Sequence, residues 1–352
     1  MTADASYTID CDPSTPRFTA AYLRVAGDEC AFIETHTSHA LPRLLAALDA
    51  RSLAPEAVRW IVVTHAHLDH AAGASALVRA CPNATLLAHP RAARHLKDPA
   101  KLVASATSVY GAARFAELYG VIEPIPEHRV RALADGESFA LGASTLTVHH
   151  TEGHANHHFV IADPALQTVF TGDAFGLVYP ALQQGSLFAF PSTSPTNFDP
   201  IEARRSIARI LALGAEVARP THFGPVSDLE GVAAQVTALL DRAEGFLDDA
   251  TRGDETLAEM TARLTVAWRD ALVSAARARG IDLGPAELAL LALDIELNAQ
   301  GVAFVADARR TKARQSGSPP VGSLGFHGSE GARSRAADLV ENWKLPPSGC
   351  AW

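Results

Sequence analysis

The 352 residues suffice for two domains, or for one large domain with an extension. A hydrophobic content of 48% and a charged content of 20% are typical of a globular protein that buries a sizeable core. The net charge of −9 argues against a protein of nucleic acid or anionic membranes, and no apolar run reaches the length of a transmembrane helix.

The cysteines and the first residues indicate the compartment. The four cysteines are scattered without close pairs, so neither a disulfide framework nor a cysteine-rich zinc site is expected. The segment Met1 to Ala5 lacks a basic stretch followed by an apolar one, so no secretory signal is visible. We therefore expect a reduced, cytoplasmic protein.

The first part of the chain alternates strands with helices. Strands are predicted at 7–10, 18–36, 58–64 and 85–88, and helices at 41–54, from about 71 to 80, and at 90–120. The last of these helical patterns carries Arg91, Arg94, His95, Lys97 and Lys101. This basic patch either faces an anionic substrate or is a solvated helix face.

One short stretch stands out after the hydrophobic run Arg59 to Val63. It reads His65-Ala66-His67-Leu68-Asp69-His70 and lies on the turn between the carboxyl end of a strand and a helix. In open α/β architectures this end of the sheet is where sites are built. Imidazole and carboxylate groups are the ligands of borderline divalent metals, so the stretch predicts a metal site.

Three later strands repeat this arrangement. Strands are predicted at 128–150, 159–161, 168–171 and 216–220. Those ending near 150, 171 and 220 are followed by Gly153-His154, Gly172-Asp173 and Thr221-His222. Candidate metal-ligating groups therefore follow four different strands.

Three further regions have a distinct composition. The segment 178–200 is rich in Phe and Pro and forms either a pocket wall for a partly hydrophobic substrate or a packed crossover loop. From about 227 to 314 the chain is Ala- and Leu-rich with helical periodicity. Residues 315–352 are rich in Gly, Ser and Pro, so they are expected to be a flexible tail with a short helix near 335–343.

The histidine stretch and the later elements resemble the metallo-β-lactamase-fold superfamily. His65 to His70 match its HxHxDH signature, and His154, Asp173 and His222 follow in the family's order. The resemblance covers roughly residues 7–226 and looks nearest to the glyoxalase II-like branch. It implies an α/β fold, a four-layer αβ/βα sandwich over 1–226, with a helical C-terminal extension at 227–314.

The resemblance also implies the role of each residue. His65, His67 and His154 resemble the ligands of a first metal ion, and Asp69, His70 and His222 those of a second, with Asp173 bridging both. Two divalent ions are implied, zinc first, with iron and manganese as alternatives. Asp69 would be a proton shuttle instead if only one ion is bound.

Other residues near these ligands are expected to support them. Glu34 stands where the family commonly has an aspartate followed by a glycine turn, and is expected to support the histidine loop. His157 and His158 are expected to orient ligands, and one of His149 and His150 to lie near the site.

The resemblance implies a hydrolase that directs a metal-bound hydroxide at a small ester, thioester, lactone or amide. The alternative is a mononuclear iron oxidoreductase of the same fold, similar to persulfide dioxygenases, because the histidine stretch alone does not select the metal. The expected partner is a small-molecule substrate, with neither nucleic acid nor membrane, and a homo-oligomer is left open.

Overall fold

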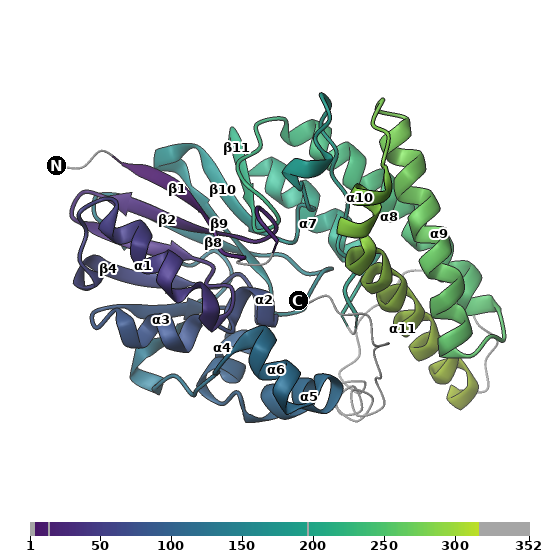
Figure 1. Cartoon of the computed structure of the whole chain (residues 1–352), viewed down its shortest axis with the longest axis horizontal. Coiled ribbons are helices and arrows are strands. Elements are labelled where there is room, and N and C mark those ends of the chain that lie inside the picture. Colours follow the sequence, from purple (N-terminus) through teal and green to yellow (C-terminus); the bar gives the residue numbers. More distant parts are fainter. Residues whose placement is uncertain (1–3, 13–14, 196, 317–352) are drawn as a thin grey trace.

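Two mixed β-sheets form the centre of the computed structural model, which describes residues 4–12, 15–195 and 197–316 (Figure 1). The first sheet runs in the order β1 (Ala5–Asp10), β2 (Ala20–Ala26), β3 (Glu29–Ile33), β4 (Val58–Val62), β5 (Thr85–Ala88), β6 (Val130–Ala132). The second runs in the order β11 (Val217–Pro220), β10 (Thr168–Gly172), β9 (Phe159–Asp163), β8 (Ser144–His150), β7 (Ser138–Leu141). In both sheets parallel and antiparallel pairs occur together.

The sheets pack face to face over an apolar layer. Tyr22 and Ile33 from the first sheet meet Phe139, Phe159 and Phe170 from the second, all of them buried. Alternate residues of a strand point to opposite faces, so the same strands also bury Leu23 and Phe32 on the other side.

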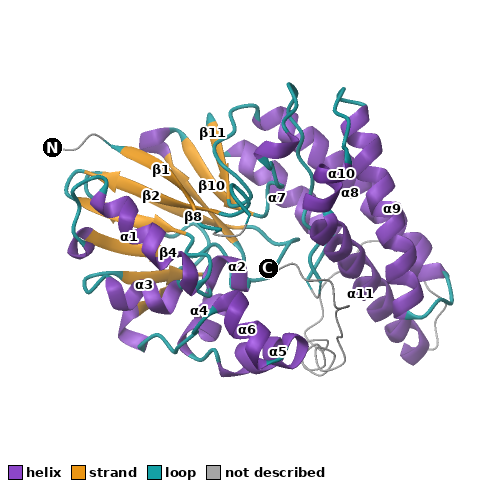
Figure 2. Ribbon diagram, viewed as in Figure 1, coloured by secondary structure: helices purple, strands orange, loops and turns teal. Residues whose placement is uncertain are grey.

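Helices cover both outer faces of this pair of sheets (Figure 2). On the first sheet, α1 (Leu41–Asp49) buries Leu44 and Leu48 in the core that also holds Phe32. The other helices of the N-terminal half are α2 (Leu68–Ala71), α3 (Ala74–Ala80), α4 (Pro90–Lys97), α5 (Ala100–Tyr110) and α6 (Ala112–Tyr119). The predicted helical stretch 90–120 is therefore three helices, interrupted at Asp98 and Pro99 and at Gly111, whose φ is +76°.

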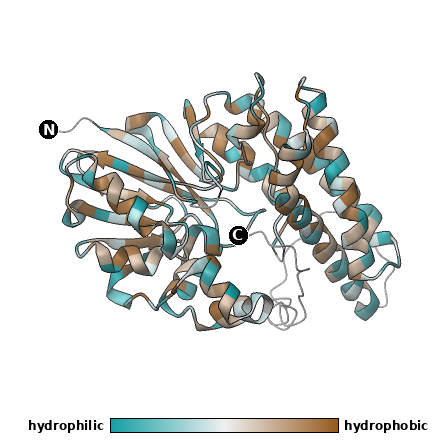
Figure 3. Ribbon diagram, in the orientation of Figure 1, coloured by the Kyte–Doolittle hydropathy of each residue, from teal (hydrophilic) through white to brown (hydrophobic). Residues whose placement is uncertain are grey.

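The other outer face is covered by α7 (Pro200–Ala212), which the sequence pattern did not predict, and the C-terminal helices form a bundle that packs against α7. These are α8 (Leu229–Arg252), α9 (Leu257–Arg277), α10 (Pro285–Leu290) and α11 (Ala292–Ser316). Hydrophobic and hydrophilic residues alternate around them (Figure 3), and their apolar faces bury Trp268 and Val302 in one core with Val160 and Val169 of the second sheet. The expected four-layer sandwich with a helical C-terminal region is confirmed.

Three expectations concern the segment 178–200 and the residues that follow it. In the 178–200 segment, Phe188, Phe190 and Phe198 are buried in the core shared with the C-terminal helices, so these rings pack rather than line a pocket. The division of the chain at residue 226 stays a prediction. The tail expected for 315–352 lies outside the described residues from 317 onward, with its short helix near 335–343, whereas 315 and 316 still belong to α11. Among the described residues, no helix has the length and apolar character that crossing a membrane requires.

A buried arginine joins the two sheets. Arg24 on β2 is fully buried and binds Asp163 at the end of β9 with its Nε. Its Nη2 donates to Ser144 Oγ (2.9 Å) and to Asp4 Oδ2 (3.0 Å). Because Asp163 is also completely buried, its charge depends on this guanidinium.

Replacing Arg24 by methionine keeps most of the apolar stem but leaves the Asp163 carboxylate buried without a cation. We expect the free energy of unfolding to fall by about 3–5 kcal/mol, measured by urea denaturation. Arg59→Met removes an exposed arginine from the Trp60 ring and is the control, with an expected change within about 0.5 kcal/mol. Equal stability of the Arg24 variant and the control would contradict the role of Arg24 in joining the two sheets.

Candidate metal centre

Side chains from both sheets meet at one edge of the sandwich. His65 and His67 lie in the loop after β4, and Asp69 and His70 in the short helix α2 that follows. From the second sheet come His154, between β8 and β9, Asp173, directly after β10, and His222, two residues beyond β11. The structure thus brings together every residue that the sequence analysis assigned to the two ions.

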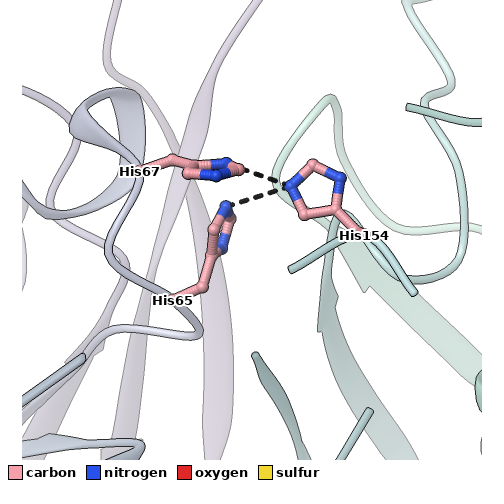
Figure 4. A group of neighbouring side chains, drawn as sticks. All are labelled: His65, His67 and His154. Atoms are coloured by element: carbon pink, nitrogen blue, oxygen red, sulfur yellow. Dashed lines mark hydrogen bonds between the residues drawn. The ribbon is translucent and has the colours of Figure 1, made fainter. Parts of the chain in front are cut away.

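The first group consists of three histidines whose ring nitrogens converge (Figure 4). His154 Nε2 lies 3.2 Å from His65 Nε2 and 3.1 Å from His67 Nδ1. Two nitrogens bound to one zinc ion at about 2.1 Å and at a tetrahedral angle lie about 3.4 Å apart. The spacing therefore fits a single ion held by all three rings.

Hydrogen bonds on the far side of two of these rings leave their Nε2 lone pairs available to a cation. His154 Nδ1 lies 3.2 Å from the carbonyl oxygen of Ser192, which can only accept, so Nδ1 carries the proton. His65 Nδ1 lies 3.0 Å from Thr64 Oγ1, whose own proton goes to Glu34, so this Nδ1 is also a donor. In the neutral rings both Nε2 atoms then present lone pairs to each other, and a metal ion between them removes the repulsion.

The second group places one carboxylate beside two further histidines. Asp69 Oδ2 lies 3.3 Å from His222 Nε2 and 3.5 Å from His70 Nε2. His222 Nδ1 donates to the carbonyl oxygen of Phe18 (2.9 Å), so its Nε2 also turns inward. These three residues form a separate set whose ligand atoms could hold an ion.

Asp173 lies between the two groups. Its Oδ1 is 3.4 Å from His70 Nε2 and 3.8 Å from His222 Nε2, whereas its Oδ2 is 3.6 Å from His154 Nε2. One carboxylate oxygen thus faces each set, which is the arrangement that offsets the repulsion between two cations about 3.5–4 Å apart.

The protonation of the two groups differs. Burial lowers the pKa of His67 to about 3 and holds that of His65 well below its usual range. Burial also disfavours the charged form of His222, but Asp173 and Asp69 overcome it and raise the pKa of His222 to about 9. Burial also disfavours the charged form of His70, but Asp173, Asp69 and Glu34 raise its pKa well above the usual range. Without a metal, the first group is therefore neutral at pH 7, and the second holds protons on both His70 and His222.

Glu34 contacts the histidine loop, and the backbone there has the positive φ values of a glycine turn although no glycine is present. Its Oε1 accepts from the hydroxyls of Thr64 and Thr221 and lies 3.3 Å from His70 Nδ1. Glu34 adopts a φ of +69° and His36 a φ of +53°, a region that favours glycine. The expected supporting role of Glu34 is consistent with these contacts.

Gly172, the residue before Asp173, passes close to the side chains of His158 and Thr64. It has a φ of +50°, and a Cβ atom there would lie 2.4 Å from His158 Nε2 and 2.6 Å from Thr64 Oγ1. A side chain at this position would push apart the two loops that carry the ligands.

Other histidines surround the centre without joining it. His158 Nε2 accepts from the Asp173 N–H (3.3 Å) and its Nδ1 lies 2.8 Å from Thr151 Oγ1, so it holds the Asp173 loop. His157 Nδ1 accepts from the Ala66 N–H (3.3 Å). His149 lies beside Arg209 and His150 beside the Leu133 carbonyl, and the expectation that one of them lies near the site stays a prediction.

Several supporting groups were not found by sequence reasoning. The carbonyl oxygens of Ser192 and Phe18 orient ligand histidines, and any residue offers a carbonyl, so the sequence carries no signal for them. Tyr179, whose ring packs beside His222, donates its hydroxyl to Asp294 on α11 (3.2 Å). Burial raises the pKa of Asp294 to about 7.

The basic patch on α4 is partly used for internal contacts. Arg91 donates to the Asn156 carbonyl oxygen (2.7 Å), in the loop that carries His154, and Lys97 pairs with Glu127 (2.9 Å). These two side chains therefore support the solvated-face alternative rather than an anion site.

Comparison with known proteins agrees with this geometry. A family model, described as the metallo-beta-lactamase superfamily, matches residues 14–222, which include all the residues of both groups. No curated protein matches the chain.

Solved structures with a similar fold include an archaeal metallo-beta-lactamase superfamily protein from Sulfolobus tokodaii. It is 21% identical with a TM-score of 0.60, and the match covers 86% of this chain and 99% of that one. A metallo-beta-lactamase family protein from Thermus thermophilus is 22% identical with a TM-score of 0.58, covering 89% and 94%. At these identities the likeness shows the fold. The superfamily resemblance of the sequence is confirmed.

The raised pKa of His222 predicts proton release on metal binding. An ion must displace the protons of His222 and His70 below about pH 9, so affinity at the second group should rise as the pH increases from 7 to 9, and the His222→Phe variant should release fewer protons. The first group, already neutral, should bind without releasing protons. Zinc titrations by calorimetry in buffers of different ionisation enthalpy measure the protons released per ion. Release that persists unchanged in a His222→Phe variant would contradict this assignment.

Proposed function

Because the chain belongs to the metallo-beta-lactamase superfamily, we propose that it is a binuclear metal-dependent hydrolase of small esters, thioesters, lactones or amides. The observation that carries the proposal is the presence of both ligand groups with Asp173 between them.

The second group favours two ions over one. A mononuclear centre needs only His65, His67 and His154 with one further ligand, whereas here Asp69 and His222 are also buried and turned toward a second position. Burying a carboxylate and an imidazole together is costly unless a cation or proton lies between them. A pair of zinc ions meets this requirement at both positions.

If both groups hold a divalent ion, the pair would supply a nucleophile from water near neutral pH and polarise the carbonyl oxygen of a substrate. The residues of the chain would position the two ions for this chemistry. Asp173 directs one oxygen toward each group, and among the histidines His65, His70, His154 and His222 are buried, whereas His67 is partly exposed. Asp69 Oδ2, 3.3 Å from His222 Nε2, would hold and pass a proton if only the first group is filled.

The surroundings of the histidine loop support a substrate with an apolar part. Leu68, inside the HxHxDH stretch, is partly exposed and packs against a buried cluster that includes Phe115 and Tyr119 of α6, as do the partly buried apolar residues of α5. This apolar surface lies beside the ligands, unlike the buried phenylalanines of the 178–200 segment. Small molecules with a hydrophobic acyl or ring portion are therefore the substrates to screen first.

Metal content is the first test of the proposal. We expect protein purified without added metal or chelator to contain about two zinc or manganese ions per chain, measured by elemental mass spectrometry. One iron per chain together with oxygen consumption on persulfides would contradict the hydrolase and indicate sulfur oxidation.

A variant then tests the bridging carboxylate. Asp173→Ala should reduce turnover of the best ester, thioester, lactone or amide by at least about 100-fold, because it removes the group between the two ions, while unfolding stays cooperative. Asp241→Asn, which changes an exposed partner of Arg204, is the matched control and should keep full activity. Substantial turnover by Asp173→Ala would exclude the bridging role.

A further inference from the structure

One buried side chain of the C-terminal region forms two hydrogen bonds with the loop behind His154. Asn298 on α11 is 1% exposed. Its Nδ2 donates to the Pro191 carbonyl oxygen (3.0 Å), and its Oδ1 accepts from the Thr193 N–H (2.6 Å). The side chain therefore brackets Ser192, which lies between the two contacts.

The bracketed residue is the one that orients His154. The carbonyl oxygen of Ser192 accepts from His154 Nδ1 at 3.2 Å. This carbonyl and the Thr193 N–H belong to the same peptide group, which is planar, so their directions are fixed relative to each other. Holding the N–H at Asn298 therefore fixes the direction in which the carbonyl meets the imidazole.

Close packing strengthens this contact. A Cβ atom at Gly301, on the same helix, would lie 1.6 Å from the Thr193 carbonyl oxygen. The Thr193 hydroxyl also donates to the Asn298 main-chain oxygen (3.0 Å). The helix and the loop thus touch backbone to backbone, which leaves the loop little freedom to turn.

We propose that Asn298 is a positioning residue of the metal centre and, through the Ser192–Thr193 peptide, sets the tautomer and direction of His154. The inference rests on the proposed metal centre and extends it to the C-terminal helices. A proton fixed on Nδ1 leaves the Nε2 lone pair for the first ion, and a carbonyl that accepts from Nδ1 makes the ring a stronger ligand.

The test compares metal binding rather than activity. Asn298→Leu keeps the number and branching of the side-chain heavy atoms and removes both hydrogen bonds. We expect zinc affinity at the first group to fall by about tenfold, measured against a competing chromophoric chelator. The visible absorption of the cobalt-loaded protein should change as well. Asn298→Asp keeps an acceptor for the Thr193 N–H and should lie nearer to the wild type.

A matched control separates positioning from stability. Arg310, also buried on α11, donates to the carbonyl oxygens of Glu255 and Ala250, in a different segment. Arg310→Met should lower the unfolding midpoint while zinc affinity and the cobalt spectrum stay unchanged. Gly301→Ala, which displaces the helix from the loop, should reproduce the effect of Asn298→Leu and decides the test if that variant does not fold.

The outcomes distinguish the inference from the centre itself. Wild-type affinity in folded Asn298→Leu, or equal losses in Asn298→Leu and Arg310→Met, would overturn the role of Asn298 and leave the proposed function intact. Wild-type protein that binds no zinc or cobalt would overturn both.

Discussion

The constraint on which this structure depends is the approach of two buried nitrogen lone pairs, those of His65 and His154, to 3.2 Å. Each ring already donates its proton on the opposite side, so a cation held between the two rings would offset that repulsion. A fold that keeps these two nitrogens close together must hold the loops that carry His65 and His154 rigidly, so that the repulsion does not separate them. The buried hydrogen bonds around the centre are best understood as the means of doing so.

The sandwich meets this demand by distributing the ligands over four strand ends. Strands held in a sheet are stiff, so loops that leave their carboxyl ends start from fixed points. The two sheets must in turn keep their relative position, and Arg24 contributes to this with a charge-assisted bond to Asp163. The distance between His65 on one sheet and His154 on the other therefore depends on contacts far from either ring.

Much of this was predictable from the sequence, for local reasons. The histidine stretch and the strands before His154, Asp173 and His222 are short patterns whose meaning depends little on distant residues. The hydrogen bond from the Thr193 N–H to Asn298 was not predictable, because it joins residues 105 positions apart and one partner is main chain. The phenylalanines of 178–200 were open to two interpretations because composition alone cannot show which surface covers a ring.

The position of Asn298 in the chain has a consequence for biosynthesis. Translation delivers every candidate ligand, the last being His222, before it delivers α11. At about 5–20 residues per second, several seconds separate the two events. During that interval the nascent chain has its histidines but not the helix that holds the His154 loop. Metal would then bind in its final geometry only to the completed chain. A product truncated before α11 would contain the candidate ligands but not the helix that positions the His154 loop.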